Sequence, residues 1–424
     1  MTLTGCAVLV AGATACGGRT ALPEREGPED RSPRRFASEP TIRVGVAWGD
    51  SAVDLTSGGR WWIHEKGSSR PIAVIDGGAS WGVVRLPLER ALRVVRPDGW
   101  LSEPHVTALQ AAPLEGEPIT VDGTAYPGRV EILLGPEGDV TAVNVVGLES
   151  YLEGVVAKEI GHPGVDAYEA IRAQAVAART YALKRLGSRA ALGFDVFGSV
   201  QDQAYAGLVG PEDSLSIRAV ADTRGEALVF NGYLIEAFYH STCGGHTARV
   251  EESFELGPVP YLKSVSDARP GGGYWCQASR YFRWTESWDR DELQRMVERN
   301  LPRLVPVPPA GVGELRDLEV LESSPEGRAL VMRVTTTTGS FLVTETAIRR
   351  LFADEDGGWL RSTAFLFRAV RDGRWIDSLS LVGGGWGHGV GMCQVGAMGR
   401  ARAGHGYGSI LKAYYNDTEI ERFY

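Results

Sequence analysis

A glutamate near the end of a predicted helix is the first candidate for chemistry. Leu148, Leu152 and Val155 recur at the spacing of one helix face, and Glu159 continues that stripe after four more residues. Burial on such a face raises the pKa of a carboxyl group, and so does the negative end of a helix dipole. A carboxyl group in these conditions can act as a general acid near neutral pH. On the pattern alone, an exposed glutamate at the helix end is the competing interpretation.

A second candidate site combines histidine and cysteine. His240, Cys243 and His246 fall within seven residues, directly after a predicted strand. Zinc favours cysteine and histidine ligands, so we expect these three residues and Cys276 to hold a structural zinc ion. Cys393 is an alternative to Cys276 as the fourth ligand. A disulfide between Cys243 and Cys276 is one alternative. The other is that neither forms and that the histidines hydrogen-bond a sugar.

A glycine-dense segment near the C-terminus is the third candidate. Seven of the fifteen residues in 383–397 are glycine, and the segment contains His388 and Gln394. Glycine permits positive φ angles and close backbone approach, so such a loop can present polar side chains to a polar ligand. A tight structural loop is the competing interpretation.

The composition narrows the class of protein. The 424 residues are 43% hydrophobic and 23% charged, which is ordinary for a soluble globular protein. The formal charge of -9 argues against nucleic acid as the main partner, because phosphate binding needs a basic face. No apolar run is long enough to span a bilayer.

The N-terminus resembles a lipoprotein leader. The apolar stretch 7–15 ends directly before Cys16, although no lysine or arginine precedes it. We expect residues 1–16 to be the leader, 17–40 to be a disordered tether, and the exported protein to be lipid-anchored at Cys16 in the cell envelope. Cys6 is a weaker lipidation site, and a frayed terminus is the other interpretation. With Cys6 and Cys16 in the leader, three cysteines remain. This number is odd, which predicts a spare thiol or a metal site.

The periodicity predicts a mixed α+β fold in which a pair of central helices carries the site, within an elongated chain of several modules. Expected strands are 42–46, 61–63, 72–75, 129–134, 140–146, 227–230, 233–239, 328–334 and 340–344; expected helices are 148–159, 167–186, 289–300, 347–352 and 407–415. Asp166 and Glu169 predict a capping box for the second helix. We expect a β-rich module at 41–120 and a catalytic region at 121–424, with an inserted hairpin and helix at about 304–375.

Several segments together resemble the stage II sporulation protein D (SpoIID/LytB) family. They occur in the family's order over about residues 120–424: Asn144–Val156, Glu159, Ala173–Ala182, Gln203–Gly207, His240–Thr247, Pro260–Leu262, Gly387–Ala397 and Tyr414–Tyr415. The family's catalytic glutamate stands in a Glu-Met-Pro-like segment. Here that position is Glu159, followed by Ile160, with the proline displaced to Pro163.

The resemblance implies a lytic transglycosylase that cleaves peptidoglycan glycan strands, with Glu159 as acid and then as base. It also implies zinc near His240 and His246. The residues expected to bind substrate or form the groove walls are Gln174, Arg179, Tyr181, Gln203, Tyr205, Ser241, His388 and Gln394. A structural ion pair is an equal alternative for Arg179.

Two other functions stay open at this point. The family name LytB also covers wall-binding proteins that stimulate a cell-wall amidase, so a non-catalytic activator is one. A zinc hydrolase, in which the metal activates water, is the other. In each case the expected partner is the cell wall, and any membrane contact is through the lipid on Cys16.

Overall fold

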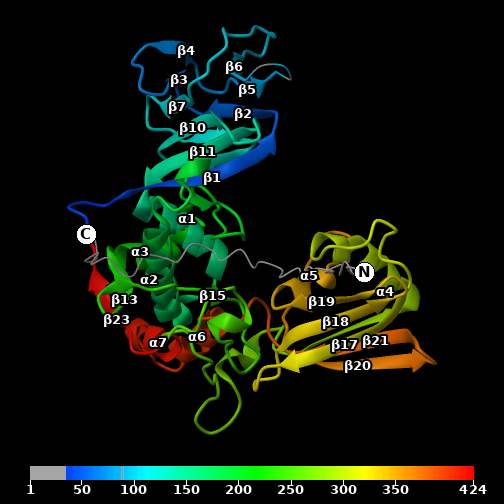
Figure 1. The fold of residues 1–424 in the computed structure, drawn as a ribbon. Coiled ribbons are helices and arrows are strands. Elements are labelled where there is room, and N and C mark those ends of the chain that lie inside the picture. The colour runs from blue at the N-terminus through cyan, green and yellow to red at the C-terminus, as the bar shows by residue number, and fades with distance from the viewer. Residues whose placement is uncertain (1–34, 87, 89) are drawn as a thin grey trace, which may run out of the picture.

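The computed structural model describes residues 35–86, 88 and 90–424 (Figure 1). Cys6, Cys16 and most of the expected tether therefore lie outside the described residues. Within the described part of the chain, no helix has both the length and the apolar character needed to cross a membrane. The fold is mixed α+β, as predicted.

Two sheets form the N-terminal part of the molecule, drawn mainly in blue and cyan in Figure 1, and their strands pair antiparallel except for the parallel pair β12 and β1. The larger sheet has the order β12-β1-β11-β10-β7-β3-β4. Its strands are β12 (Val196–Phe197), β1 (Thr41–Asp50), β11 (Val140–Gly147), β10 (Arg129–Leu134), β7 (Leu109–Pro113), β3 (Trp61–Glu65) and β4 (Pro71–Ile75). The smaller sheet contains β6 (Leu92–Val95), β5 (Trp81–Arg85), β2 (Ala52–Ser57), β8 (Ile119–Val121) and β9 (Thr124–Tyr126).

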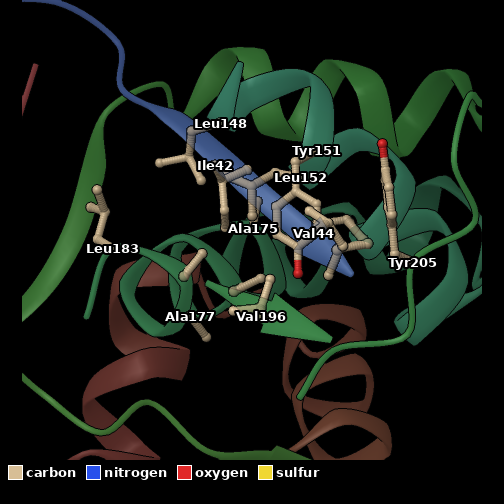
Figure 2. Packing of buried hydrophobic residues seen from close by; sticks show 14 of the residues in the cluster. Ile42, Val44, Leu148, Tyr151, Leu152, Ala175, Ala177, Leu183, Val196 and Tyr205 are labelled. Atoms are coloured by element: carbon tan, nitrogen blue, oxygen red, sulfur yellow. The ribbon is translucent and has the colours of Figure 1, made fainter. Parts of the chain in front are cut away.

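Strand β11 runs directly into helix α1 (Leu148–Ile160), so the sheet fixes where the helix begins. The next helix is α2 (Tyr168–Arg185), and alanine is its commonest residue. Figure 2 shows Ala175 and Ala177 among the buried side chains of the cluster that also contains Leu148 and Leu152. Because alanine side chains are short, α2 can be buried on almost every face between α1 and its other neighbours.

Segments from the middle and from the C-terminal end of the chain pack beside these helices (Figure 1). They comprise α3 (Ser214–Asp222), α6 (Gln394–Arg402), α7 (Tyr407–Tyr414), the sheet of β13 (Glu226–Phe230), β14 (Tyr233–Leu234) and β23 (Glu419–Arg422), and the parallel pair β15 (Tyr239–His240) and β22 (Met392–Cys393). The turn between β13 and β14 has positive φ angles at Asn231 and Gly232, as the Asn-Gly pair predicts. Its second strand ends at Leu234 rather than continuing to Tyr239.

The predicted capping box at α2 is wrong. The helix begins at Tyr168 with no side-chain cap. Asp166 instead pairs with Arg402, and Glu169 accepts a 2.8 Å hydrogen bond from the backbone N–H of Tyr407. Glu169 therefore stabilises the start of α7, because an acidic side chain at a helix N-terminus satisfies a free donor.

A separate module follows, drawn in yellow and orange in Figure 1, with its own hydrophobic cluster between Trp284 and Leu381. Its elements are β16 (Trp284–Asp289), α4 (Arg290–Asn300), β17 (Leu315–Ser323), β18 (Ala329–Thr336), β19 (Ser340–Thr344), α5 (Ala347–Leu351), β20 (Phe365–Asp372) and β21 (Trp375–Gly383). Asp289 and Glu292 form a capping box at α4. The expected insertion, 304–375, lies inside the span of this cluster.

Candidate functional site

Glu159 occupies the next-to-last position of α1, where the helix stops at Gly161 with φ of 66°. The side chain is partly buried, and its Oε1 accepts a 2.7 Å hydrogen bond from the backbone N–H of Ala204. Burial raises the pKa of Glu159 to about 6, although the N–H of Ala204 and the amide of Gln394 act in the opposite direction. The carboxyl group therefore stays protonated to a higher pH than an ordinary glutamate does.

The chain that supplies the Ala204 N–H lies directly against α1. The backbone N–H of Ala206 donates to the carbonyl of Gly154 at 3.3 Å. A Cβ atom at Gly154 would lie 2.4 Å from the carbonyl oxygen of Gly207 and 2.7 Å from the Tyr205 ring. Glycine at this helix position thus allows the close approach on which the Glu159 hydrogen bond depends.

Two glutamines lie on the other side of Glu159. The Gln394 side-chain amide donates to the backbone carbonyl of Glu159 at 3.2 Å and to Oε1 of Gln174 at 3.4 Å. Both glutamines are buried, and Nε2 of Gln174 has no partner among the described residues. The structure therefore brings three of the predicted site residues together.

A pocket of about 140 Å³ contains two further predicted residues, Tyr181 and His388. The complete lining is Tyr181, Val200, Gln201, Asp202, Phe238, Tyr239, Phe254 and His388. Burial and then the nearby charge of Glu159 raise the pKa of Tyr239 well above its usual value. The Gln203 amide donates to the Tyr239 hydroxyl at 2.9 Å, and the N–H of the next residue, Ala204, donates to the Glu159 carboxylate, so this segment connects the pocket wall to Glu159.

His388 and His240 are held as neutral rings. Nε2 of His388 donates to the carbonyl of Tyr239 at 2.9 Å, and its Nδ1 accepts from the N–H of Val390 at 3.1 Å. Burial lowers the pKa of His388 to about 3 and that of His240 well below its usual value. Neither ring is a candidate proton donor at neutral pH.

Other predicted substrate-binding residues are engaged within the protein. Arg179 is fully buried and makes a bidentate ion pair with Glu149, with N–O distances of 2.9 and 2.7 Å. The Tyr205 hydroxyl donates to Asn144 at 3.0 Å, while Gln203 binds the hydroxyl groups of both Tyr151 and Tyr239. The carbonyl of Ser241 accepts from the N–H of Val395. These contacts stabilise the walls of the site, and for Arg179 the structure shows the ion-pair alternative.

The cysteines form a buried group with an aspartate. One ligand atom each from Cys243, Asp267, Cys276 and Cys393 lies within 4.8 Å of the others, and all four residues are buried. The Sγ atoms of Cys243 and Cys276 are 3.5 Å apart, so the two thiols are free rather than joined in a disulfide. The group could hold a metal ion.

The surroundings of this cysteine and aspartate group favour the binding of a cation. The backbone N–H groups of Gly245 and Gly396 donate to the sulfur atoms of Cys243 and Cys393 at 3.4 and 3.3 Å. Burial raises the pKa of the Cys243 thiol well above its usual value and that of Asp267 to about 7, because buried anions without a cation are costly. A metal ion would remove this cost.

The ligand group differs from the expected one. It contains Cys243 and Cys276, as predicted, and also Cys393, which the sequence offered as an alternative fourth ligand. His240 lies outside it, with Nδ1 bound to the carbonyl of Val390 at 3.1 Å. His246 is exposed and also lies outside the group. Asp267 had no signal in the sequence, because its position beside the thiols depends on tertiary contacts.

Comparisons with known proteins identify the chain's relatives. The family described as "Stage II sporulation protein" matches residues 136–230, which contain α1, α2 and Ala204. Stage II sporulation protein D of Bacillus subtilis is 28% identical over 66% of this chain and 76% of its own length. This chain belongs to the stage II sporulation protein D family. The resemblance inferred from the sequence motifs is confirmed.

Further relatives have different descriptions. An uncharacterized protein of Brachyspira hyodysenteriae is 31% identical over 71% of this chain and 73% of its own length. The amidase enhancer of Bacillus subtilis is 29% identical, and the match spans only 40% of that protein. A domain of unknown function (DUF8618) matches residues 271–391, which include most of the separate module.

Substitution of Gly154 by alanine tests the contact between α1 and the following loop. We expect a loss of about 1–3 kcal/mol in the free energy of unfolding, because the added Cβ overpacks the interface. Hydrogen exchange at the Ala204 amide should also accelerate, since its bond to Glu159 is displaced. Gly257→Ala is the matched control, because Gly257 has no atom within 4 Å of a built Cβ. Equal stability and equal Ala204 exchange in both variants would refute the contact.

Proposed function

We propose that this protein cleaves the glycan strands of peptidoglycan by a lytic transglycosylase reaction, with Glu159 as the catalytic residue. The observation that carries the proposal is the partly buried Glu159 carboxyl group, whose pKa is raised to about 6. Membership of a cell-wall-related family supports the choice of substrate.

In this proposal, protonated Glu159 gives its proton to the oxygen between N-acetylmuramic acid and N-acetylglucosamine while the glycosidic bond breaks. The Ala204 N–H then stabilises the carboxylate that forms, because it already donates to Oε1. That carboxylate removes the proton from the sugar's own 6-hydroxyl, whose oxygen attacks the oxocarbenium-like carbon. One carboxylate suffices, in contrast to the usual glycosidase pair, because the substrate supplies the nucleophile.

The pocket that Tyr239 and His388 line supports a role in sugar binding. Tyr181, Phe238 and Phe254 contribute aromatic rings to it, and neutral His388 contributes no charge. The resemblance to the family also implied Tyr181 and His388 as substrate-binding residues. We include Gln174 and Gln394 in the site because their amide groups lie next to Glu159.

Glu159→Gln should abolish formation of anhydro-sugar ends, with at least a thousandfold loss of rate, because glutamine cannot transfer the proton. In the wild-type protein, the rate should fall as the pH rises through about 6, the raised pKa of the catalytic acid. Mass spectrometry of products from purified peptidoglycan measures both effects. Retained wall binding in the variant is the control, and undiminished cleavage would exclude this role of Glu159.

The raised pKa also predicts a stability effect that does not depend on activity. Because the folded pKa lies above the usual 4.5, folding favours protonated Glu159; this contribution is complete below pH 4.5 and is lost as the pH rises through about 6. The free energy of unfolding of Glu159→Gln, relative to that of the wild type, should therefore rise by about 2 kcal/mol between pH 4 and pH 8. Urea unfolding at the two pH values measures this, and a constant difference would contradict the burial argument.

We also propose that the Cys243, Asp267, Cys276 and Cys393 group holds zinc in a structural role. The four residues supply four ligand atoms, the number that a structural zinc ion binds, so a zinc ion held by all four would have no position for a reacting water. This argues against the zinc hydrolase. Cys393 also caps the start of α6, directly before Gln394, so a bound ion would help to fix Gln394 against Glu159.

Metal analysis tests the proposed ligands. Cys393→Ser and Cys276→Ser should each lose most of the zinc and lower the melting temperature, because a structural ion stabilises the folded chain. His246→Ala should keep the wild-type zinc content, since His246 lies outside the group. Zinc loss in His246→Ala with full retention in Cys393→Ser would overturn this ligand set.

The similarity to the amidase enhancer favours a second candidate, a non-catalytic wall-binding activator of a cell-wall amidase. Peptide-stripped glycan separates the two functions. Release of soluble anhydro fragments by the protein alone supports the lyase, and stimulation of an amidase without such release supports the activator.

Both candidates place the protein in the cell envelope. We propose export and lipid anchoring at Cys16, which the leader-like sequence supports. We also keep, as a proposal, the division into a β-rich module at 41–120 and a catalytic region at 121–424 with an inserted module.

A further inference from the structure

A second pocket, of about 250 Å³, lies between the separate module and the glycine-rich loop. Trp386, Tyr281, Trp359, Arg361, Glu286 and Asp354 are among the residues that line it. Trp386 comes from the glycine-rich loop, Tyr281 lies just before β16, and the other four come from the separate module; all six lie within 271–391, the range that matches a domain of unknown function.

Aromatic side chains form much of this pocket. Trp386 and Trp359 are 40% and 51% exposed, so both present large ring surfaces to solvent. Trp386 packs against Tyr281 with ring centroids 4.5 Å apart, and Arg350 lies over the Trp359 ring at 5.7 Å. These contacts hold the rings in place, although exposed tryptophans are otherwise unfavourable on a protein surface.

Two acidic residues and one basic residue line the pocket, so its charged lining residues disfavour an anionic ligand. Arg361 is paired with Glu286, so their charges cancel. Asp354 adds a negative charge and is held by the N–H of Gly358 at 2.6 Å. Fixed tryptophan faces beside planar polar groups suit the apolar face and the hydroxyl groups of a neutral sugar.

The glycine-rich loop links this pocket to the smaller pocket that His388 and Tyr239 line. Trp386 is two residues before His388, which lines the smaller pocket beside Tyr239. The N–H of Gly387, between them, donates to the carbonyl of Arg361 at 2.8 Å. Gly389, directly after His388, has a positive φ angle and passes so close to Arg328 that an added Cβ would lie 2.5 Å from its Nη2.

We propose that this pocket binds a sugar unit of the glycan chain, away from the linkage that is cleaved. The inference rests on the proposed function in taking a cell-wall glycan as the ligand. Trp359 and Trp386 provide the stacking faces, while Arg361, Glu286 and Asp354 hydrogen-bond the hydroxyl or acetamido groups. The module thereby lengthens the binding surface for the glycan.

Titration calorimetry with peptide-stripped glycan strands tests the pocket, using the full chain with Glu159→Gln so that the ligand stays intact. Introducing Trp359→Ala into this Glu159→Gln background should raise the Kd for the glycan about tenfold, equivalent to about 1.4 kcal/mol. Trp359→Phe should restore most of the affinity because it retains an aromatic face. Trp375→Ala is the matched control, since Trp375 lies in the same module and outside the pocket lining. It should leave the Kd unchanged.

An unchanged Kd in Trp359→Ala, with a wild-type melting temperature, would overturn the inference. So would binding of a free stem peptide that is lost in Trp359→Ala while glycan binding persists. The two proposals fail separately. Weakened glycan binding in Trp359→Ala without cleavage by the wild type would remove only the lyase, and cleavage with an unchanged Kd would remove only this pocket.

Discussion

The site depends on one constraint, which is the contact between the C-terminal end of α1 and the chain around Ala204. Two of the glutamates on helix α1, Glu149 and Glu159, lie in different environments. Glu149 pairs with the buried guanidinium of Arg179, whereas the Glu159 carboxylate accepts a backbone N–H. The Arg179 guanidinium holds Glu149 in an ion pair inside the protein, whereas burial raises the pKa of Glu159 to about 6. This difference separates a structural glutamate from a catalytic candidate on the same helix.

The sequence could predict α1 and the position of Glu159, because a helix stripe is local and its period appears directly in the residues. It could not predict the partners. Ala204 contributes a backbone N–H, which no residue type signals. Glu169 has the right spacing for a local capping box, yet the arrival of α7 gives it another donor. Asp267 joins the cysteines because three distant segments meet there. In each case tertiary contacts decide between partners that the sequence leaves equivalent.

The glycine-rich loop connects three features that are far apart along the chain. His388 lines the pocket beside Tyr239, Cys393 belongs to the buried thiol group, and Gln394 binds the backbone of Glu159. The separate module contacts the same region through Arg328, whose guanidinium donates to the carbonyl groups of Cys243 and His246 at 3.3 and 3.2 Å. Because the separate module contacts this region, its position is compatible with a role in ligand binding.

The protonation state of Glu159 is the most direct test of the account. Carbon-13 NMR of the carboxyl group can follow its titration in the folded protein, with Glu159→Gln identifying the signal. The account predicts a midpoint near pH 6, because the group is desolvated at the end of α1. A midpoint at or below the ordinary value of 4.5 would show a well-solvated or charge-paired carboxylate, and Glu159 could not then be the acid.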